Sequence, residues 1–111
     1  MAWYWHQYVG ADLAGVPGYA APATVADVRG LAPALIVSAQ FDPLRDEAEN
    51  YAARLAAAGV PTRMIRVDGQ IHSFLSFVGV MTTADAAVAE IAAAIKHLWA
   101  GTPAETTEVA T

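Results

Sequence analysis

The chain has 111 residues, no cysteine, and a formal net charge of -5. Its six basic residues are scattered, so no basic stripe is available to neutralise phosphates, and we expect no binding to nucleic acid. The lack of cysteine excludes disulfides, thiolate metal sites and cysteine nucleophiles, and it fits a reducing, cytoplasmic location. No apolar run approaches the roughly 20 residues that cross a bilayer, so we expect no membrane span.

The first third of the chain contains one predicted helix and a long loop. Residues 1–10, "MAWYWHQYVG", are rich in aromatic residues and predict a short helix that Gly10 ends. Residues 16–33 carry proline and glycine at close intervals without a sustained period, which is typical of a loop. The apolar run "ALIVSA", residues 34–39, then predicts a strand that is buried on both faces.

A helix is predicted directly after this strand. It begins near Pro43 or Leu44, and Gly59 is placed as its left-handed stop, with Pro61 preventing its continuation. Acidic residues fill its first turns, where they favour the helix dipole. Its apolar positions follow the period of an amphipathic helix: Ala48, Tyr51, Ala52, Leu55 and Ala56.

The last part of the chain predicts a second strand and a covering helix. Residues 62–67 alternate polar and apolar side chains, and Asp68-Gly69 is a turn signal. A helix is predicted over about 84–99 with Thr83 as its cap. Its predicted apolar stripe comprises Val88, Ile91, Ala92, Ile95 and Leu98. Residues 100–111 are small and polar and predict a disordered tail.

This order of elements predicts an α/β fold. Two strands joined by a crossover helix pair in parallel with a right-handed connection, and the last helix covers the sheet. The carboxyl ends of parallel neighbours emerge at one edge, where open α/β sheets hold their ligands. Asp42 follows the first strand and His72 follows the second, so both side chains are expected at that edge. A carboxylate beside an imidazole fixes the ring tautomer and stabilises the imidazolium, as general-base chemistry requires.

Other interpretations of these residues stay open from the sequence. Asp42 is also suited to be an ordinary turn residue and the N-cap of the helix that follows, and a single loop histidine is commonly structural or solvent-facing. The histidines His6, His72 and His97 are isolated, so no metal site is expected, and no phosphate or dinucleotide motif predicts a cofactor.

The two loops with their surroundings resemble a known family. The segment "LAPALIVSAQFDPLRDEAENYAARLAAAGVP", followed by "DGQIHSF", is similar to the carboxyl-terminal part of hormone-sensitive-lipase-like carboxylesterases, which have the α/β-hydrolase fold. The resemblance covers about residues 1–99 and implies a βαβα portion of that fold, preceded by the aromatic helix. It implies that Asp42 is the triad acid and His72 the triad base. From their position directly after the histidine, Phe74 and Leu75 are expected to line the alcohol or acyl side of the substrate pocket. The implied substrate is a small acyl ester.

This sequence departs from the family in two respects. Ser73 stands where the family usually has a glycine after the histidine. The only serines are Ser38, Ser73 and Ser76, and none lies in the Gly-x-Ser-x-Gly elbow that carries the nucleophile. Because the fold's chain order is nucleophile, acid, histidine, we expect residues 1–99 to be the carboxyl-terminal segment of a longer domain, with the amino-terminal half of the same fold as its missing partner.

The resemblance therefore predicts an ester-hydrolase fragment that is inactive alone. Two alternatives stay open: a non-catalytic small-molecule-binding protein of the same fold, and a fragment of a serine peptidase of the same fold.

Overall fold

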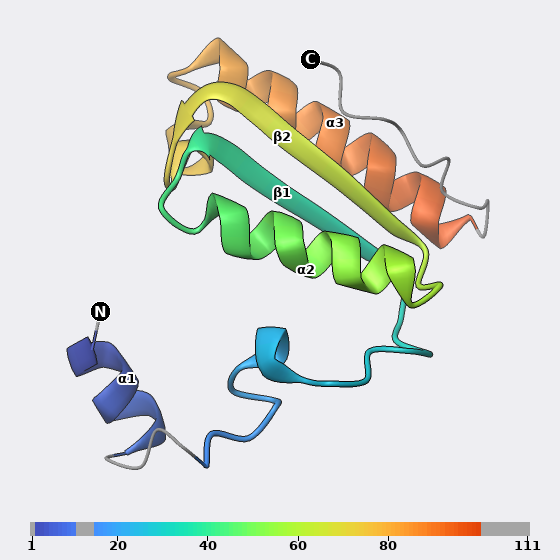
Figure 1. The fold of residues 1–111 in the computed structure, drawn as a ribbon. Helices are drawn as coiled ribbons and strands as arrows, with labels where there is room; N and C mark the ends of the chain where they lie inside the picture. The colour runs from blue at the N-terminus through green and yellow to red at the C-terminus, as the bar shows by residue number, and fades with distance from the viewer. Residues whose placement is uncertain (1, 11–14, 101–111) are drawn as a thin grey trace.

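The computed structural model describes residues 2–10 and 15–100. The elements in chain order are α1 (Ala2–Val9), η1 (Pro22–Thr24), β1 (Ala34–Phe41), α2 (Arg45–Ala57), β2 (Thr62–Ile71), η2 (Phe74–Phe77) and α3 (Thr82–Trp99). The two strands pair in parallel, and α2 and α3 cover opposite sides of them (Figure 1). The predicted α/β order is confirmed.

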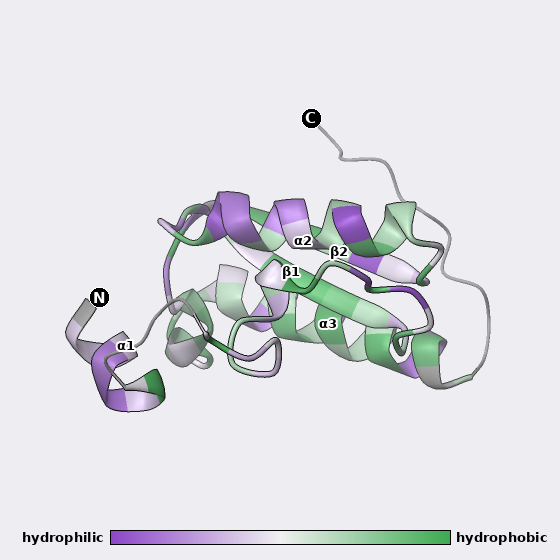
Figure 2. Cartoon of the chain, turned by 60° about the horizontal axis from the view of Figure 1, so that its bottom comes forward, coloured by the Kyte–Doolittle hydropathy of each residue, from purple (hydrophilic) through white to green (hydrophobic). Residues whose placement is uncertain are grey.

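The three layers explain the apolar character of β1. Figure 2 shows β1 in green between α2 above it and α3 below it. On the α2 side, Leu55 and Val60 form a buried cluster with Val28. On the α3 side, Ala39 of β1 packs with Phe74 and with the start of α3. A strand covered on both faces needs apolar residues at successive positions rather than at alternate ones. Only Ser38 and Ala39 of β1 are fully buried, and residues 34–37 are half-buried, so the predicted burial on both faces is met in part.

Both strands are longer than predicted, and they change register near their ends. Pairing runs from Ala34 with Thr62 to Ala39 with Val67, and then shifts so that Phe41 pairs with Ile71. The turn predicted at Asp68-Gly69 is wrong, because these residues lie inside β2. Gly69 has φ +72°, so the turn signal marks a bulge within the strand instead.

Helix α2 agrees closely with its prediction. Its buried residues are Ala52 and Leu55, while Ala56 is exposed. Gly59 follows the helix with φ +79°, and the Val60 amide donates to the Leu55 carbonyl oxygen at 3.0 Å. The predicted glycine stop is confirmed, and this bond closes the end of the helix after the left-handed glycine.

Helix α3 is rotated relative to its prediction. The buried residues are Ala84, Ala87 and Ala94, whereas Val88 and Ile95 of the predicted stripe are exposed. Small side chains allow the helix backbone to approach the sheet, so the alanines occupy the contact and the larger residues flank it.

The start of α3 also differs from its prediction. The helix begins at Thr82 with no side-chain cap, so the predicted cap Thr83 is wrong. The Asp85 carboxylate instead accepts a hydrogen bond from the Gly79 amide at 2.8 Å.

The amino-terminal part lies apart from the sheet. Helix α1 lies away from the two strands in Figure 1 and ends before Gly10, whose φ of +81° suits the predicted helix stop. Its aromatic residues Trp3, Tyr4 and Tyr8 are exposed. The loop after it is attached through Arg54 of α2, which donates to the carbonyl oxygens of residues 23 and 25. None of the helices in residues 2–10 and 15–100 combines the length and the hydropathy that crossing a membrane requires. The predicted tail, apart from Ala100, lies outside the described residues.

Candidate active site

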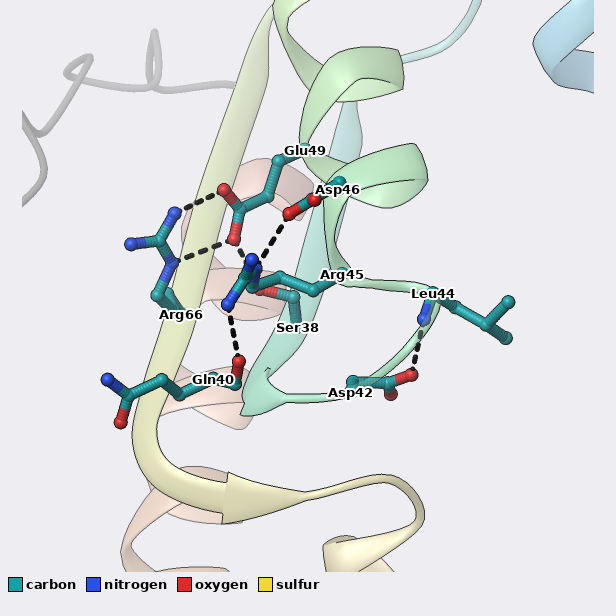
Figure 3. A network of polar contacts seen from close by, with 8 residues as sticks. All are labelled: Ser38, Gln40, Asp42, Leu44, Arg45, Asp46, Glu49 and Arg66. Atoms are coloured by element: carbon teal, nitrogen blue, oxygen red, sulfur yellow. Dashed lines mark hydrogen bonds and ion pairs between the residues drawn. The ribbon is translucent and has the colours of Figure 1, made fainter.

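Asp42 is held by backbone hydrogen bonds just after β1. Its amide donates to the Ala39 carbonyl at 3.2 Å, and its own carbonyl accepts from the Arg45 amide at 3.1 Å. Its Oδ1 accepts from the Leu44 amide at 2.8 Å (Figure 3). Asp42 thus forms the turn into α2, as one sequence interpretation expected, but the N-cap of α2 is Leu44, so the expected N-cap role of Asp42 is wrong. The turn fixes the direction of the second carboxylate oxygen of Asp42.

The structure brings Asp42 and His72 together. His72 follows β2, and its Nδ1 lies 2.9 Å from Asp42 Oδ2. The Asp42 side chain is 15% exposed, and the His72 ring is 57% exposed. One carboxylate oxygen therefore orders the turn, and the other orients the imidazole, which is more than half exposed.

The charge on this pair follows from the hydrogen bonds. The Leu44 amide, and after it the His72 ring, lower the pKa of Asp42 below its usual range. An ionised carboxylate only accepts hydrogen bonds, so the neutral His72 ring must carry its proton on Nδ1. That tautomer leaves a lone pair on Nε2, and the arrangement is able to take up a proton there while Asp42 stabilises the resulting cation.

Ser73, the position that departs from the family pattern, has an unusual backbone. Its φ is +62° and its ψ is +19°. No other non-glycine residue among residues 2–10 and 15–100 has a positive φ. This left-handed conformation is freely accessible to glycine and strained for other residues. A physical reason for the usual glycine is thus visible: the chain must turn sharply after His72 to enter η2.

The three serines occupy different environments. Ser38 is buried, and its hydroxyl donates to Glu49 Oε1 at 2.9 Å. Glu49 also accepts from Arg66 Nε at 2.8 Å, and this arginine is the main cause of the lowered pKa of Glu49. Figure 3 shows these contacts joining β1, α2 and β2. Ser73 and Ser76 are exposed and lie on the chain directly after His72.

The two predicted pocket residues pack in or against the hydrophobic core. Phe74 is 4% exposed and packs with Ala39, Ala84 and Ala87, while Leu75 is half-buried against the same cluster. Contact of either residue with a substrate stays a prediction. The described residues contain no group of three or more histidine, aspartate or glutamate side chains placed to hold a metal ion.

Sequence reasoning missed two residues beside the pair. Gln40 Oε1 accepts a hydrogen bond from the Gly69 amide at 2.7 Å, and the backbone carbonyl oxygen of Gln40 accepts from Arg45 Nη1 at 2.6 Å. The available signal was a polar residue at the end of an apolar strand, next to an arginine in the helix start.

Comparison with known proteins identifies the family. A family model described as alpha/beta hydrolase fold matches residues 1–76. The chain belongs to the hormone-sensitive-lipase-like α/β-hydrolases. It is 36% identical over 97 residues to the carboxylesterase NlhH of Mycobacterium tuberculosis, covering 87% of this chain and 30% of that protein. It is 48% identical over 54 residues to an arylesterase of Saccharolobus solfataricus, covering 49% of this chain and 18% of that protein.

Solved esterase structures agree with the fold of the described residues. A hyperthermophilic esterase from Pyrobaculum calidifontis superposes with a TM-score of 0.79 and 39% identity, covering 87% of this chain and 32% of that chain. An ester hydrolase from the metagenome of Lake Arreo superposes with a TM-score of 0.80 and 35% identity, covering 90% of this chain and 32% of that chain. The chain thus spans about a third or less of the length of these relatives, and it shares the esterase-like α/β-hydrolase fold with them.

Proposed function

We propose that this chain supplies the acid and the general base of a carboxylic-ester hydrolase, with Asp42 as the acid and His72 as the base. The observation that supports the proposal is the 2.9 Å separation of Asp42 Oδ2 from His72 Nδ1, at the edge where both strands end. The similarity to an arylesterase and to a carboxylesterase favours carboxylic esters as the substrate class.

In the proposed reaction, a serine hydroxyl attacks the ester carbonyl while His72 Nε2 takes up its proton. The Asp42 carboxylate stabilises the imidazolium without becoming protonated. The imidazolium then gives that proton to the departing alkoxide, so the alcohol leaves and an acyl-serine remains. Water, deprotonated by the same nitrogen, releases the carboxylic acid and restores the serine.

The nucleophile of this reaction is not one of the three serines of the chain. Ser38 is buried and bonded to Glu49, and Ser73 and Ser76 follow the histidine, whereas the fold carries its nucleophile before the acid. We therefore propose that catalysis needs the nucleophile-bearing half of an α/β-hydrolase domain. The proposal also includes the prediction that Phe74 and Leu75 line the substrate pocket, and Leu75 packs against the buried cluster that contains Phe74.

A chimera tests the assignment of the pair. Residues 1–99 replace the matching segment of the Pyrobaculum calidifontis esterase, and kcat/KM is measured with p-nitrophenyl butyrate. We expect ester hydrolysis in the chimera, with a loss on the order of 10⁴ in kcat for Asp42→Asn and at least as large a loss for His72→Ala.

The matched control in the chimera is Arg63→Met, which changes a residue at the start of β2 whose ion pair with Glu90 is remote from His72. We expect its kcat to stay within about threefold of the parent, because an exposed ion pair contributes little to stability. A folded chimera that Asp42→Asn leaves within tenfold of its parent would contradict the proposal.

The chain itself provides a second test. Because the proposal places the nucleophile and the oxyanion hole outside this chain, we expect the chain to hydrolyse p-nitrophenyl acetate no faster than free imidazole does. A burst of p-nitrophenol that His72→Ala abolishes would show that the chain acts alone, contrary to the proposal.

A further inference from the structure

The change of register between β1 and β2 determines which residue faces Asp42. Up to Ala39, which pairs with Val67, the two strands advance together. Continuing that register would set Asp42 opposite Gln70. After the irregularity, Phe41 pairs with Ile71, so that the next residues along the two strands, Asp42 and His72, meet. The bulge in β2 is therefore a precondition of the pair.

The bulge leaves a backbone group that the regular ladder does not satisfy. Gly69 lies within it at φ +72°, and its amide donates at 2.7 Å to Oε1 of Gln40, which stands at the gap in the register on β1. A side chain has replaced the carbonyl of the neighbouring strand as the acceptor. Because bulges disrupt the ladder locally, an acceptor supplied at this point stabilises one bulged register over its alternatives.

Gln40 is itself held in place. Its backbone carbonyl oxygen accepts from Arg45 Nη1 at 2.6 Å, while Arg45 Nε donates to Asp46 Oδ1 at 2.8 Å (Figure 3). Arg45 belongs to the first turn of α2 and its amide bonds to the Asp42 carbonyl. Arg45 thus bonds both to Gln40, beside the bulge, and to the turn that carries Asp42.

We propose that Gln40 is a positioning residue, whose amide oxygen fixes the bulge of β2 so that His72 faces Asp42. The role needs an acceptor at the end of a side chain of this length, and it does not need an amide. Its importance for ester hydrolysis rests on the function proposed above, whereas its effect on the geometry of the pair does not.

Three variants of Gln40 separate the effect of the acceptor from that of side-chain length. Gln40→Met keeps the length without the acceptor, Gln40→Asn keeps the amide but is shorter by one carbon, and Gln40→Glu keeps both length and acceptor. Amide hydrogen exchange at Gly69 reports the bond directly. Two-bond ¹H–¹⁵N spectra of the ring report the tautomer of His72, and the chimera gives kcat and KM.

We expect Gln40→Met and Gln40→Asn to speed exchange at Gly69 about tenfold and to reduce the fraction of His72 with its proton on Nδ1. In the chimera we expect kcat to fall about tenfold at unchanged KM, since the variants displace the base without touching a binding contact. Gln40→Glu restores all three readouts to near those of the parent. If Gln40→Met fails to fold, Gln40→Asn gives the same comparison with a polar residue.

Two results would overturn the inference: a His72 spectrum unchanged in both Gln40→Met and Gln40→Asn, or an equal change in Arg63→Met, which would indicate a general loss of stability. Failure of the proposed function gives a different pattern. In that case Asp42→Asn leaves the kcat of the chimera intact, while Gln40→Met still shifts the ring spectrum of His72.

Discussion

Replacing Ser73 with glycine removes the backbone strain that the structure shows directly after His72. Ser73 has φ +62° and ψ +19°, a conformation in which the Cβ of an L-residue approaches the following carbonyl. Its side chain is exposed, and no side-chain cap bond is present at the start of η2. The substitution therefore changes mainly the backbone preference at this position.

The magnitude follows from two opposing contributions. A non-glycine residue in the left-handed region costs about 1–2 kcal/mol. Glycine makes the unfolded chain more flexible, which offsets about 0.4–1 kcal/mol of that gain. The difference leaves the variant about 0.8 kcal/mol more stable, equivalent to about a fourfold larger folding equilibrium constant. For a domain of this size, the expected rise in Tm is about 3–6 °C.

Urea denaturation followed by far-ultraviolet circular dichroism measures this change in the free energy of unfolding. Ser76→Gly is the matched control, because Ser76 lies in η2 at a negative φ, where glycine destabilises by about 0.5–1 kcal/mol. We expect the two substitutions to have opposite signs. A Ser73→Gly variant that is less stable than the parent chain, or that changes in step with Ser76→Gly, refutes the strain argument.

Three further predictions concern the scaffold. Leu55→Ala, at a side chain 2% exposed between β1 and the loop of residue 28, lowers the free energy of unfolding by about 2–5 kcal/mol in the same urea assay, and a loss below 1 kcal/mol would contradict the packing. Gly59→Ala costs about 1 kcal/mol from φ +79° alone, since a Cβ there meets no atom within 4 Å; an unchanged Tm would be inconsistent with this. Because Arg66 lowers the pKa of Glu49, the stability that this pair contributes is present above about pH 4.3 and is lost as the pH falls below that value. Glu49→Gln is expected to make this loss of stability with falling pH shallower. Parallel pH profiles of the parent and the variant would argue against the contribution of the pair.

The sequence was sufficient for those features that depend on local chemistry and period. The apolar run 34–39 between proline and polar residues predicted a strand, and Gly59 predicted the end of a helix; both are observed. The placement of Asp42 and His72 at one edge followed from parallel pairing, because carboxyl ends of neighbouring strands share an edge, whereas their direct contact also depends on the bulge in β2. These predictions needed no knowledge of side-chain packing.

Features that depend on packing between elements could not be predicted from periodicity. In α3, large residues such as Val88 and Ile95 suggested the buried face, but the close approach of the helix selected alanines such as Ala87. An Asp-Gly pair such as that at 68–69 suits both a turn and a bulge. The two are distinguished here by the acceptor that Gln40 of the neighbouring strand provides for the Gly69 amide. Exposed aromatic residues on α1 are likewise unexplained by contacts within the described residues.

The ring nitrogens of His72 provide the most direct test of the acid–imidazole pair on which the proposed function rests. Selective ¹⁵N-histidine labelling and two-bond ¹H–¹⁵N correlation determine which nitrogen carries the proton in the neutral ring. The structure predicts Nδ1–H in the parent chain and a shift toward Nε2–H, the tautomer usual for a free side chain, in Asp42→Asn. An Nε2–H ring in the parent, or a spectrum that Asp42→Asn leaves unchanged, would contradict the account.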